Sequence, residues 1–222
     1  MVHIRGTPTS GKTVLSRLLY SHVREYHPAY TILHVTWVPI GARAPSERHW
    51  ENFLCNHSNN YPLDQRVKPG SLRSRSDLVI VIDEAQLSYS KNDQSIWVEC
   101  LKNQSQSTFG PHFALFSSFG SASDTAITIE GSAPVTLEKI QRVSLIPQPG
   151  WPHDISLCFT RDEVHDLGHR MARDRGFYID SDVLEHLFIQ ANGHPGLTAA
   201  LLRSLFELPV RISLILLAIW DL

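Results

Sequence analysis

Hydrophobic residues in this chain form short runs that alternate with amphipathic segments. The unbroken apolar run 78–82 is typical of a strand that is buried on both faces of a sheet. Apolar or alternating segments predict four further strands, at 2–5, 30–38, 112–116 and 142–146. Apolar residues at helical spacing predict helices between them, at 14–23, 46–55 and 94–103. Strands that alternate with helices indicate an α/β fold with a parallel sheet, so we expect a core of about five strands with helices on both faces.

Beyond about residue 160 the pattern becomes helical throughout. The sequence Thr160-Arg161-Asp162-Glu163 is a capping box, and apolar residues at helical spacing follow it. A second helix is expected after Asp180 or Ser181 and a third near Pro195, with Asn192-Gly193 ending the second. We therefore predict three parts: an α/β core over 1–150, a small helical lid subdomain over 151–207, and an apolar tail over 208–222.

The composition is that of a folded protein without an obvious charged partner. Of the 222 residues, 42% are hydrophobic, which excludes a wholly disordered chain. The 20 Lys and Arg residues nearly balance the 22 Asp and Glu residues, so the composition does not support nucleic-acid binding. The three cysteines are widely spaced, which argues against a disulfide framework, and no segment resembles a signal peptide or membrane span. We expect an intracellular protein, in the cytoplasm or nucleus.

The clearest motif is a glycine loop near the N-terminus. Residues 6–13 match the phosphate-loop (Walker A) pattern G-x-x-x-x-G-K-[ST], and they lie between a predicted strand and a predicted helix. Backbone N–H groups at the start of that helix are expected to bind phosphate oxygens. Lys12 would hold the β- and γ-phosphates and Thr13 the Mg²⁺ ion. The candidate nucleotide-binding residues are Gly6, Thr7, Pro8, Thr9, Ser10, Gly11, Lys12, Thr13 and Val14. The alternative is a Gly-Ser loop with one solvated lysine.

An acidic pair follows the buried run 78–82. Asp83 and Glu84 stand at the carboxyl end of the predicted strand, where parallel sheets bind ligands. Asp83 is expected to hold Mg²⁺, directly or through water, and Glu84 to polarise the attacking water. Glu84 and Lys12 are therefore the catalytic candidates. The alternative is an acidic pair that only caps a core strand.

Two weaker features would complete such a site. Ser118 follows the strand 112–116 and is placed to contact the γ-phosphate or the water, although ordinary polarity at a strand end explains it equally well. The turn 193–196 contains His194 and Pro195 and would face the base or the phosphates of a nucleotide under a lid. A plain turn between two helices is the alternative for that segment.

Several segments, in their order along the chain, resemble a known family. They are Arg-Gly-Thr-Pro at 5–8, Asp-Glu-Ala-Gln at 83–86 with Ser-Tyr at 88–89, and the stretches 115–121, 141–145, 159–163 and 191–196. Over about residues 2–207 the chain resembles the P-loop NTPase domain of fungal Crinkler-type proteins and, more broadly, STAND and AAA-like ATPases with a helical lid. The resemblance implies nucleotide-dependent switching inside a longer protein, and it alone implies delivery into a host cell. It places Lys12 and Thr13 at the phosphate and Mg²⁺ positions, and Asp83 and Glu84 at the metal and base positions.

The chain departs from this family in three ways. The first strand is expected at once, without a header region, and the apolar tail 208–222 resembles no effector domain, as expected of a truncated or misread end. No arginine stands at 117–119, where many STAND proteins have one after the strand. Arg142 and Arg161 are candidates to supply a positive charge to the transition state, but many other arginines of the chain are equally suitable.

Two hypotheses from different classes remain. The first is an ATPase switch, in which ATP and Mg²⁺ order the lid and slow hydrolysis releases it. The second is a non-catalytic nucleotide-binding or protein-interaction scaffold, with a homo-oligomer or another protein as partner. A GTPase or small-molecule kinase is a third reading, but the chain has no Asn-Lys-x-Asp guanine motif.

Overall fold

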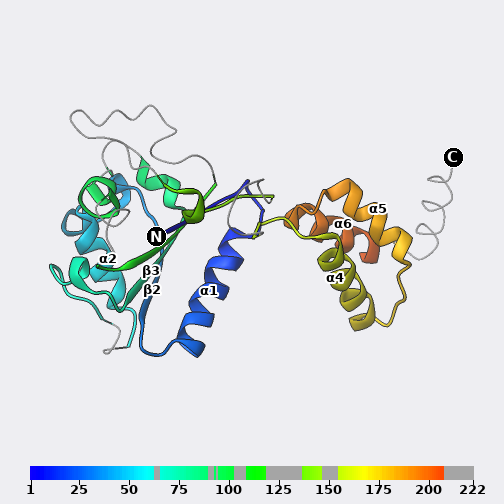
Figure 1. The fold of residues 1–222 in the computed structure, drawn as a ribbon, viewed down its shortest axis with the longest axis horizontal. Helices are drawn as coiled ribbons and strands as arrows, with labels where there is room; N and C mark the ends of the chain where they lie inside the picture. The colour runs from blue at the N-terminus through cyan, green and yellow to red at the C-terminus, as the bar shows by residue number, and fades with distance from the viewer. Residues whose placement is uncertain are drawn as a thin grey trace. The chain divides into compact units, whose positions relative to one another are not determined.

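The structure of the protein is a computed structural model that describes residues 1–62, 66–89, 93, 95–102, 109–118, 137–146 and 155–207. The chain divides into two compact units. Unit 1 comprises Met1–Pro8 and Lys12–Ile155, and unit 2 comprises Thr9–Gly11 and Ser156–Leu222. Figure 1 labels the main helices and strands of both. The predicted boundary at 150/151 and the tail 208–222 lie outside the described residues.

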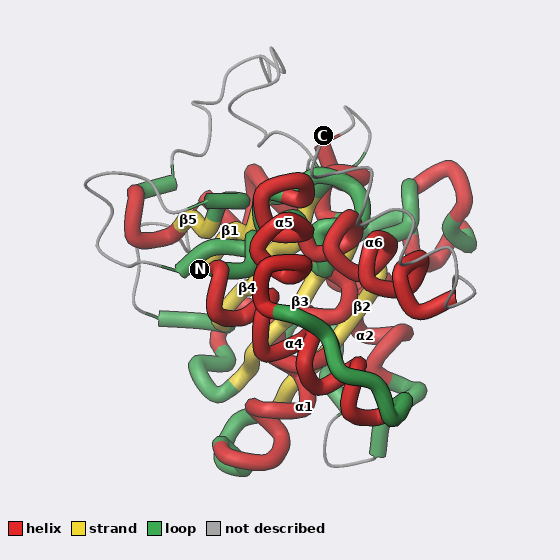
Figure 2. The backbone as a smooth tube through the Cα atoms, turned by 90° about the vertical axis from the view of Figure 1, so that its right-hand side faces the viewer, coloured by secondary structure: helices red, strands yellow, loops and turns green. Residues whose placement is uncertain are grey.

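Unit 1 is built on a parallel sheet. Among the described residues its strands are β1 (Val2–Arg5), β2 (Thr31–Thr36), β3 (Leu78–Asp83), β4 (His112–Ser117) and β5 (Arg142–Val143). Their order is β2-β3-β4-β1-β5, and every neighbouring pair is parallel. The predicted α/β fold is therefore confirmed. Because the strands, yellow in Figure 2, run in the same direction, all their carboxyl ends meet at one edge of the sheet.

Helices lie on both faces of this sheet. Figure 1 shows α1 (Lys12–Tyr26) on one side of β2 and β3 and α2 (Trp50–Ser58) on the other. The larger core cluster includes Trp37, Trp50 and Trp97, and each of these side chains is at most 1% exposed. Short helical turns complete the unit; they are Ile40–Ala42, Pro45–Glu47, Leu72–Ser74, η5 (Ala85–Tyr89), the π-helical turn Trp97–Leu101, and Lys139–Gln141.

Two predicted segments differ in their limits from the observed elements. The helix expected over 46–55 begins only at Trp50, because Pro45 starts a separate 3₁₀ turn and the His49 side chain caps α2. The segment after the predicted helix 46–55 contains the end of α2 and a 3₁₀ turn. Both ends of the helix expected over 94–103 lie outside the described residues.

An ion-pair network ties α2 to the segments around it. The Glu99 Oε2 atom accepts hydrogen bonds from Trp50 Nε1 at 3.3 Å and from Arg73 Nη2 at 2.6 Å. Arg73 also pairs with Glu51 at 3.3 Å. Desolvation raises the pKa of Glu99, but the hydrogen bonds from Trp50 and Arg73 outweigh it and leave the pKa below its usual value. Arg73 is thus engaged in ion pairs within the fold.

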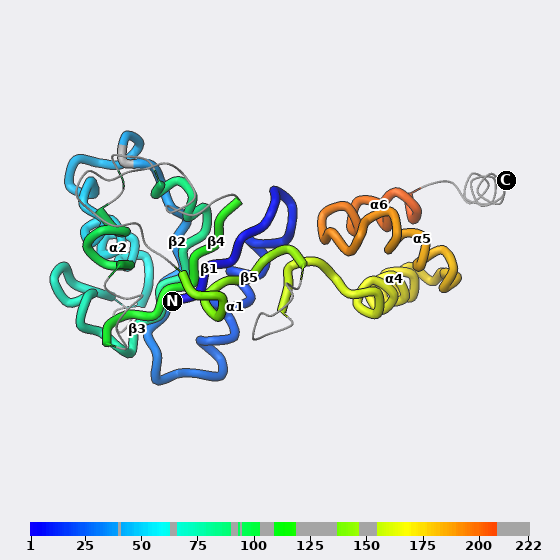
Figure 3. Tube along the Cα trace, turned by 45° about the horizontal axis from the view of Figure 1, so that its top comes forward, coloured from blue at the N-terminus to red at the C-terminus, as the bar shows by residue number. Residues whose placement is uncertain are grey.

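Unit 2 is a small helical bundle. Its helices α4 (Arg161–Asp174), α5 (Ser181–Ala191) and α6 (Pro195–Glu207) pack on one another, as Figure 3 shows in yellow to orange. The predicted capping box is present, because Thr160 N donates to Glu163 Oε2 at 2.7 Å and Glu163 N donates to Thr160 Oγ1 at 3.3 Å. The core of the bundle consists of Ala172, Ile179, Leu184, Leu187 and Leu202. In the described part of the chain, no helix is both long and apolar enough to cross a membrane.

Candidate functional site

Lys12, the first residue of α1, donates hydrogen bonds to the start of the glycine loop. Its ammonium group donates hydrogen bonds to the carbonyl oxygens of Gly6, at 3.0 Å, and Thr7, at 2.6 Å. The residue is only 6% exposed. Burial lowers the pKa of the Lys12 amine, and the carboxylates of Glu84 and Asp83 act against that shift. The lysine of the loop therefore lies within the electrostatic field of the acidic pair.

The acidic pair lies at the carboxyl end of β3, as the sequence predicts. β3 and β1 flank β4 in the parallel sheet, so Asp83 and the end of β1 lie at the same edge. Asp83 is 3% exposed, and its Oδ1 accepts a hydrogen bond from the Glu84 backbone N–H at 3.0 Å. Glu84 is more accessible than Asp83. This arrangement suits a buried ligand for a cation and a more accessible base.

Unusual backbone angles cluster at these two segments. Thr9 has φ +63° and Glu84 has φ +55°, and among the described non-glycine residues only Asn192 shares a positive φ. Gly11 has φ +83°, which glycine tolerates because it has no Cβ atom. Strained backbone of this kind concentrates at functional sites. Both segments therefore carry a feature that neither their composition nor their hydrophobic pattern predicts.

The first turn of α1 is fixed to β2 by a polar contact. Ser16 Oγ donates to the Thr13 carbonyl at 2.9 Å and lies 2.9 Å from His34 Nε2 on β2. Burial lowers the pKa of His34, while Asp83 acts to raise it. A neutral His34 can donate its Nε2–H to Ser16, which orients the turn that carries Thr13 and Val14. The side chains of Thr13 and Val14 are both exposed.

A buried polar cluster behind the loop is absent from the sequence expectations. His3 Nε2 lies 2.7 Å from Ser117 Oγ and 3.1 Å from Tyr89 OH. The alternation in β1 suggests a polar outer face at His3, but His3 is 1% exposed and Val2 is 38% exposed. β1 is an interior strand, and His3 and Ile4, which point to opposite faces of the sheet, are both buried, so both faces are covered at this point. The Gly6 N–H donates to the Ser117 carbonyl at 3.1 Å, so this cluster also supports the loop.

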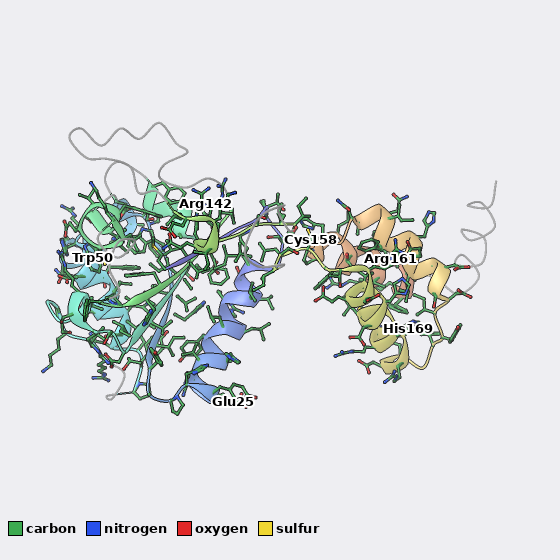
Figure 4. All side chains as sticks on the ribbon, in the orientation of Figure 1. Glu25, Trp50, Arg142, Cys158, Arg161 and His169 are labelled. Atoms are coloured by element: carbon green, nitrogen blue, oxygen red, sulfur yellow. The ribbon has the colours of Figure 1, made fainter. Side chains whose placement is uncertain are left out.

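The remaining predicted residues are divided between the two units. Ser118 directly follows β4 in unit 1, and its backbone N–H donates to Gln86 Oε1 at 3.0 Å. His194 and Pro195 belong to unit 2, at the start of α6. Figure 4 labels Arg142, on β5 of unit 1, and Arg161, at the first position of α4 in unit 2. A role of these residues toward a nucleotide stays a prediction.

The donor set of unit 1 fits Mg²⁺ bound together with a phosphate ligand. Asp83 offers a carboxylate and Thr13 a hydroxyl, and Mg²⁺ prefers oxygen ligands. Among the described residues there is no cluster of three or more His, Cys, Asp or Glu side chains that could hold a metal alone. Magnesium sites that use one or two side chains and take their other ligands from phosphates and water need no such cluster.

Comparison with known proteins supports the fold class. The Walker-type ATPase PABY2304 of Pyrococcus abyssi superposes with a TM-score of 0.52 at 15% sequence identity, over 89% of this chain and 60% of that one. The RuvB Holliday junction branch migration motor of Thermotoga maritima gives a TM-score of 0.49 at 13% identity, over 93% of this chain and 54% of that one. The chain thus spans less than two thirds of either structure.

At 15% sequence identity, the similarity to the Pyrococcus abyssi ATPase shows a shared fold and not a shared activity. This chain has a parallel sheet in the order β2-β3-β4-β1-β5 followed by a helical bundle, and its fold is similar to that of the Walker-type ATPase. No protein-family model matches the chain. No curated protein matches it either. The resemblance to Crinkler-type proteins therefore has no family-level support.

Proposed function

We propose that this protein binds a nucleoside triphosphate, most favourably ATP, with Mg²⁺ and hydrolyses it slowly. The observation that carries the proposal is the position of Lys12. Its ammonium group is held by the carbonyls of Gly6 and Thr7 and interacts with the charges of both Asp83 and Glu84. A phosphate-loop lysine and an acidic pair at one edge of a parallel sheet form the framework that phosphoryl transfer needs.

Each of these residues has a distinct role in the proposal. The backbone N–H groups at the start of α1 bind phosphate oxygens, because they have no partner within the helix. Lys12 leaves the carbonyls of Gly6 and Thr7 and donates to the β- and γ-phosphates. Asp83 and Thr13 hold the Mg²⁺ ion, which neutralises phosphate charge. Glu84 accepts a proton from the attacking water.

The helical bundle is the second component of the proposed function. By resemblance to STAND and AAA-like ATPases, unit 2 would act as a lid that nucleotide binding orders and hydrolysis releases. His194 and Pro195, at the start of α6, are the residues that would contact the nucleotide. A place inside a longer Crinkler-type protein is part of the same proposal, and it rests on the sequence segments alone.

Turnover measurements on Glu84→Gln test the catalytic part of the proposal. The variant keeps the size of the side chain and removes the base, so we expect kcat to fall by about 100-fold or more while ATP affinity stays similar. Glu25→Gln, at an exposed glutamate on α1, is the matched control and should retain full turnover. Equal turnover in wild type and Glu84→Gln would contradict this role.

The alternative is a nucleotide-binding scaffold without turnover. It is favoured by the lack of an arginine at 117–119, the segment that follows β4. Under this alternative the wild type binds Mg-ATP through Lys12 but releases no phosphate. The turnover assay therefore separates the two candidate functions.

A further inference from the structure

One buried side-chain amide joins the predicted base to the end of β4. Gln86 lies in η5, two residues after Glu84, and is 7% exposed. Its Nε2 atom donates to Glu84 Oε2, and its Oε1 atom accepts from the Ser118 backbone N–H at 3.0 Å. Gln86 thus connects the carboxyl ends of β3 and β4 through two hydrogen bonds.

The contact with Ser118 fixes the orientation of the amide. A backbone N–H can only donate, so Gln86 must present its oxygen to Ser118 and its NH₂ group to Glu84. Ser118 directly follows β4, which pairs with both β1 and β3, so the anchor lies at the carboxyl end of an interior strand. Rotation of the amide would break both hydrogen bonds at a buried position, which is costly.

The backbone of Glu84 is constrained as well. Its φ of +55° is rare for an L-residue, and such strain persists only where the surroundings determine the conformation. The Glu84 N–H donates to Asp83 Oδ1 at 3.0 Å, and the Glu84 carbonyl accepts from Leu87 N at 3.0 Å. Both the main chain and the carboxylate of Glu84 are therefore held in place.

We propose that Gln86 is a positioning residue for Glu84. The amide holds one oxygen of the Glu84 carboxylate and leaves the second to accept from a water molecule at the phosphate site. A neutral amide orients the carboxylate without giving it a proton, so Glu84 keeps its capacity as a base. The inference deepens the proposed function and rests on it, because it assumes that Glu84 acts on water.

Nuclear magnetic resonance tests the contact without any turnover. In the ¹⁵N-labelled full chain, Glu84→Ala should shift the side-chain amide resonance of Gln86 and the backbone amide resonance of Ser118. In a Gln86→Met background, which keeps the side-chain volume but not the amide, Glu84→Ala should leave the Ser118 resonance in place. An equal response of Ser118 in both backgrounds would overturn the proposal.

ATP turnover tests the positioning role itself. Gln86→Met should lower kcat by about 10- to 100-fold, because small misplacements of a catalytic group are costly, and change KM for ATP by less than about twofold. Gln86→Asn keeps the amide but is one methylene too short to reach both partners, so it should give the same pattern.

Ser88→Ala is the structural control for these variants. Ser88 lies in the same turn as Gln86; its Oγ donates to the Ala85 carbonyl at 2.6 Å and accepts from Nε1 of Trp97, in the π-helical turn, at 2.7 Å. Its removal should weaken the turn and leave kcat unchanged. Unchanged kcat in Gln86→Met, or an equal loss in Ser88→Ala, overturns the positioning role. A wild type without turnover contradicts the proposed function instead, and the resonance experiment then decides the role of Gln86.

Discussion

Gly193 is required by the geometry of unit 2, and its replacement by alanine should destabilise the bundle strongly. A Cβ atom at this position would lie 2.2 Å from the Phe159 carbonyl oxygen, closer than real contacts allow. The residue has φ +69°, and its carbonyl accepts a hydrogen bond from Phe159 N at 2.8 Å. The side chain would therefore have to displace backbone rather than a flexible neighbour.

The expected cost can be worked out from these contacts. A left-handed conformation costs an L-residue about 1 kcal/mol, and the loss of the Phe159 hydrogen bond costs about 1 kcal/mol more. Gly176 is the matched control, because it has φ +73° but no atom within 4 Å of its virtual Cβ. Gly176→Ala should incur only the conformational part, which the reduced entropy of the unfolded chain partly offsets.

Hydrogen exchange of the α5 and α6 amides in the full chain measures this difference. We expect Gly193→Ala to be less stable than Gly176→Ala by roughly 1–3 kcal/mol, the lost bond plus the displaced backbone, which corresponds to about 5- to 150-fold faster exchange. Exchange rates in the two variants that agree within about threefold would refute the reasoning, since the close approach to Phe159 would then carry no energetic weight.

Three further predictions concern unit 1. Arg43 and Asp93 form a buried ion pair at 3.0 Å, with side chains 1% and 2% exposed. Arg43→Met should lower the free energy of unfolding, measured by urea titration, by roughly 3–5 kcal/mol, because it leaves the Asp93 charge buried without its partner. The double variant Arg43→Met/Asp93→Leu should recover part of this loss. Burial raises the pKa of Cys100 to about 12, so alkylation at pH 8, followed by peptide mass spectrometry, should modify Cys100 only after unfolding. The pKa of Glu99 is lowered in the fold, so its charge stabilises the protein above the usual glutamate pKa. Glu99→Gln should therefore lower the free energy of unfolding at pH 7. Urea titrations should show the difference between the variant and the wild type shrinking as the pH falls through the lowered pKa.

The sequence predicts the sheet and the bundle well for a physical reason. Runs such as 78–82 are apolar because the strand is covered on both faces, and the helices of unit 2 have explicit start and end signals at Thr160 and at 192–193. Such local signals are independent of the rest of the chain. The positions of Lys12 and the acidic pair at one edge follow from the motif and the parallel topology together.

The supporting contacts of the site could not be predicted in the same way. Gln86 and Ser118 are 32 positions apart in the sequence, and only the pairing of β3 with β4 brings their backbones together. The sequence alternation suggests that His3 is a polar outer residue, but His3 lies on an interior strand and is buried. These contacts depend on topology, which periodicity alone does not specify.

Calorimetric titration with Mg-ATP tests the central claim most directly. The account predicts saturable binding to the wild type and binding at least about 30-fold weaker to Lys12→Met, because a charged hydrogen-bond donor to phosphate is lost. Lys68→Ala, at an exposed lysine of the same unit, should bind like the wild type. Absence of binding to the wild type, or equal affinity in Lys12→Met, would contradict the assignment of the glycine loop as a nucleotide site.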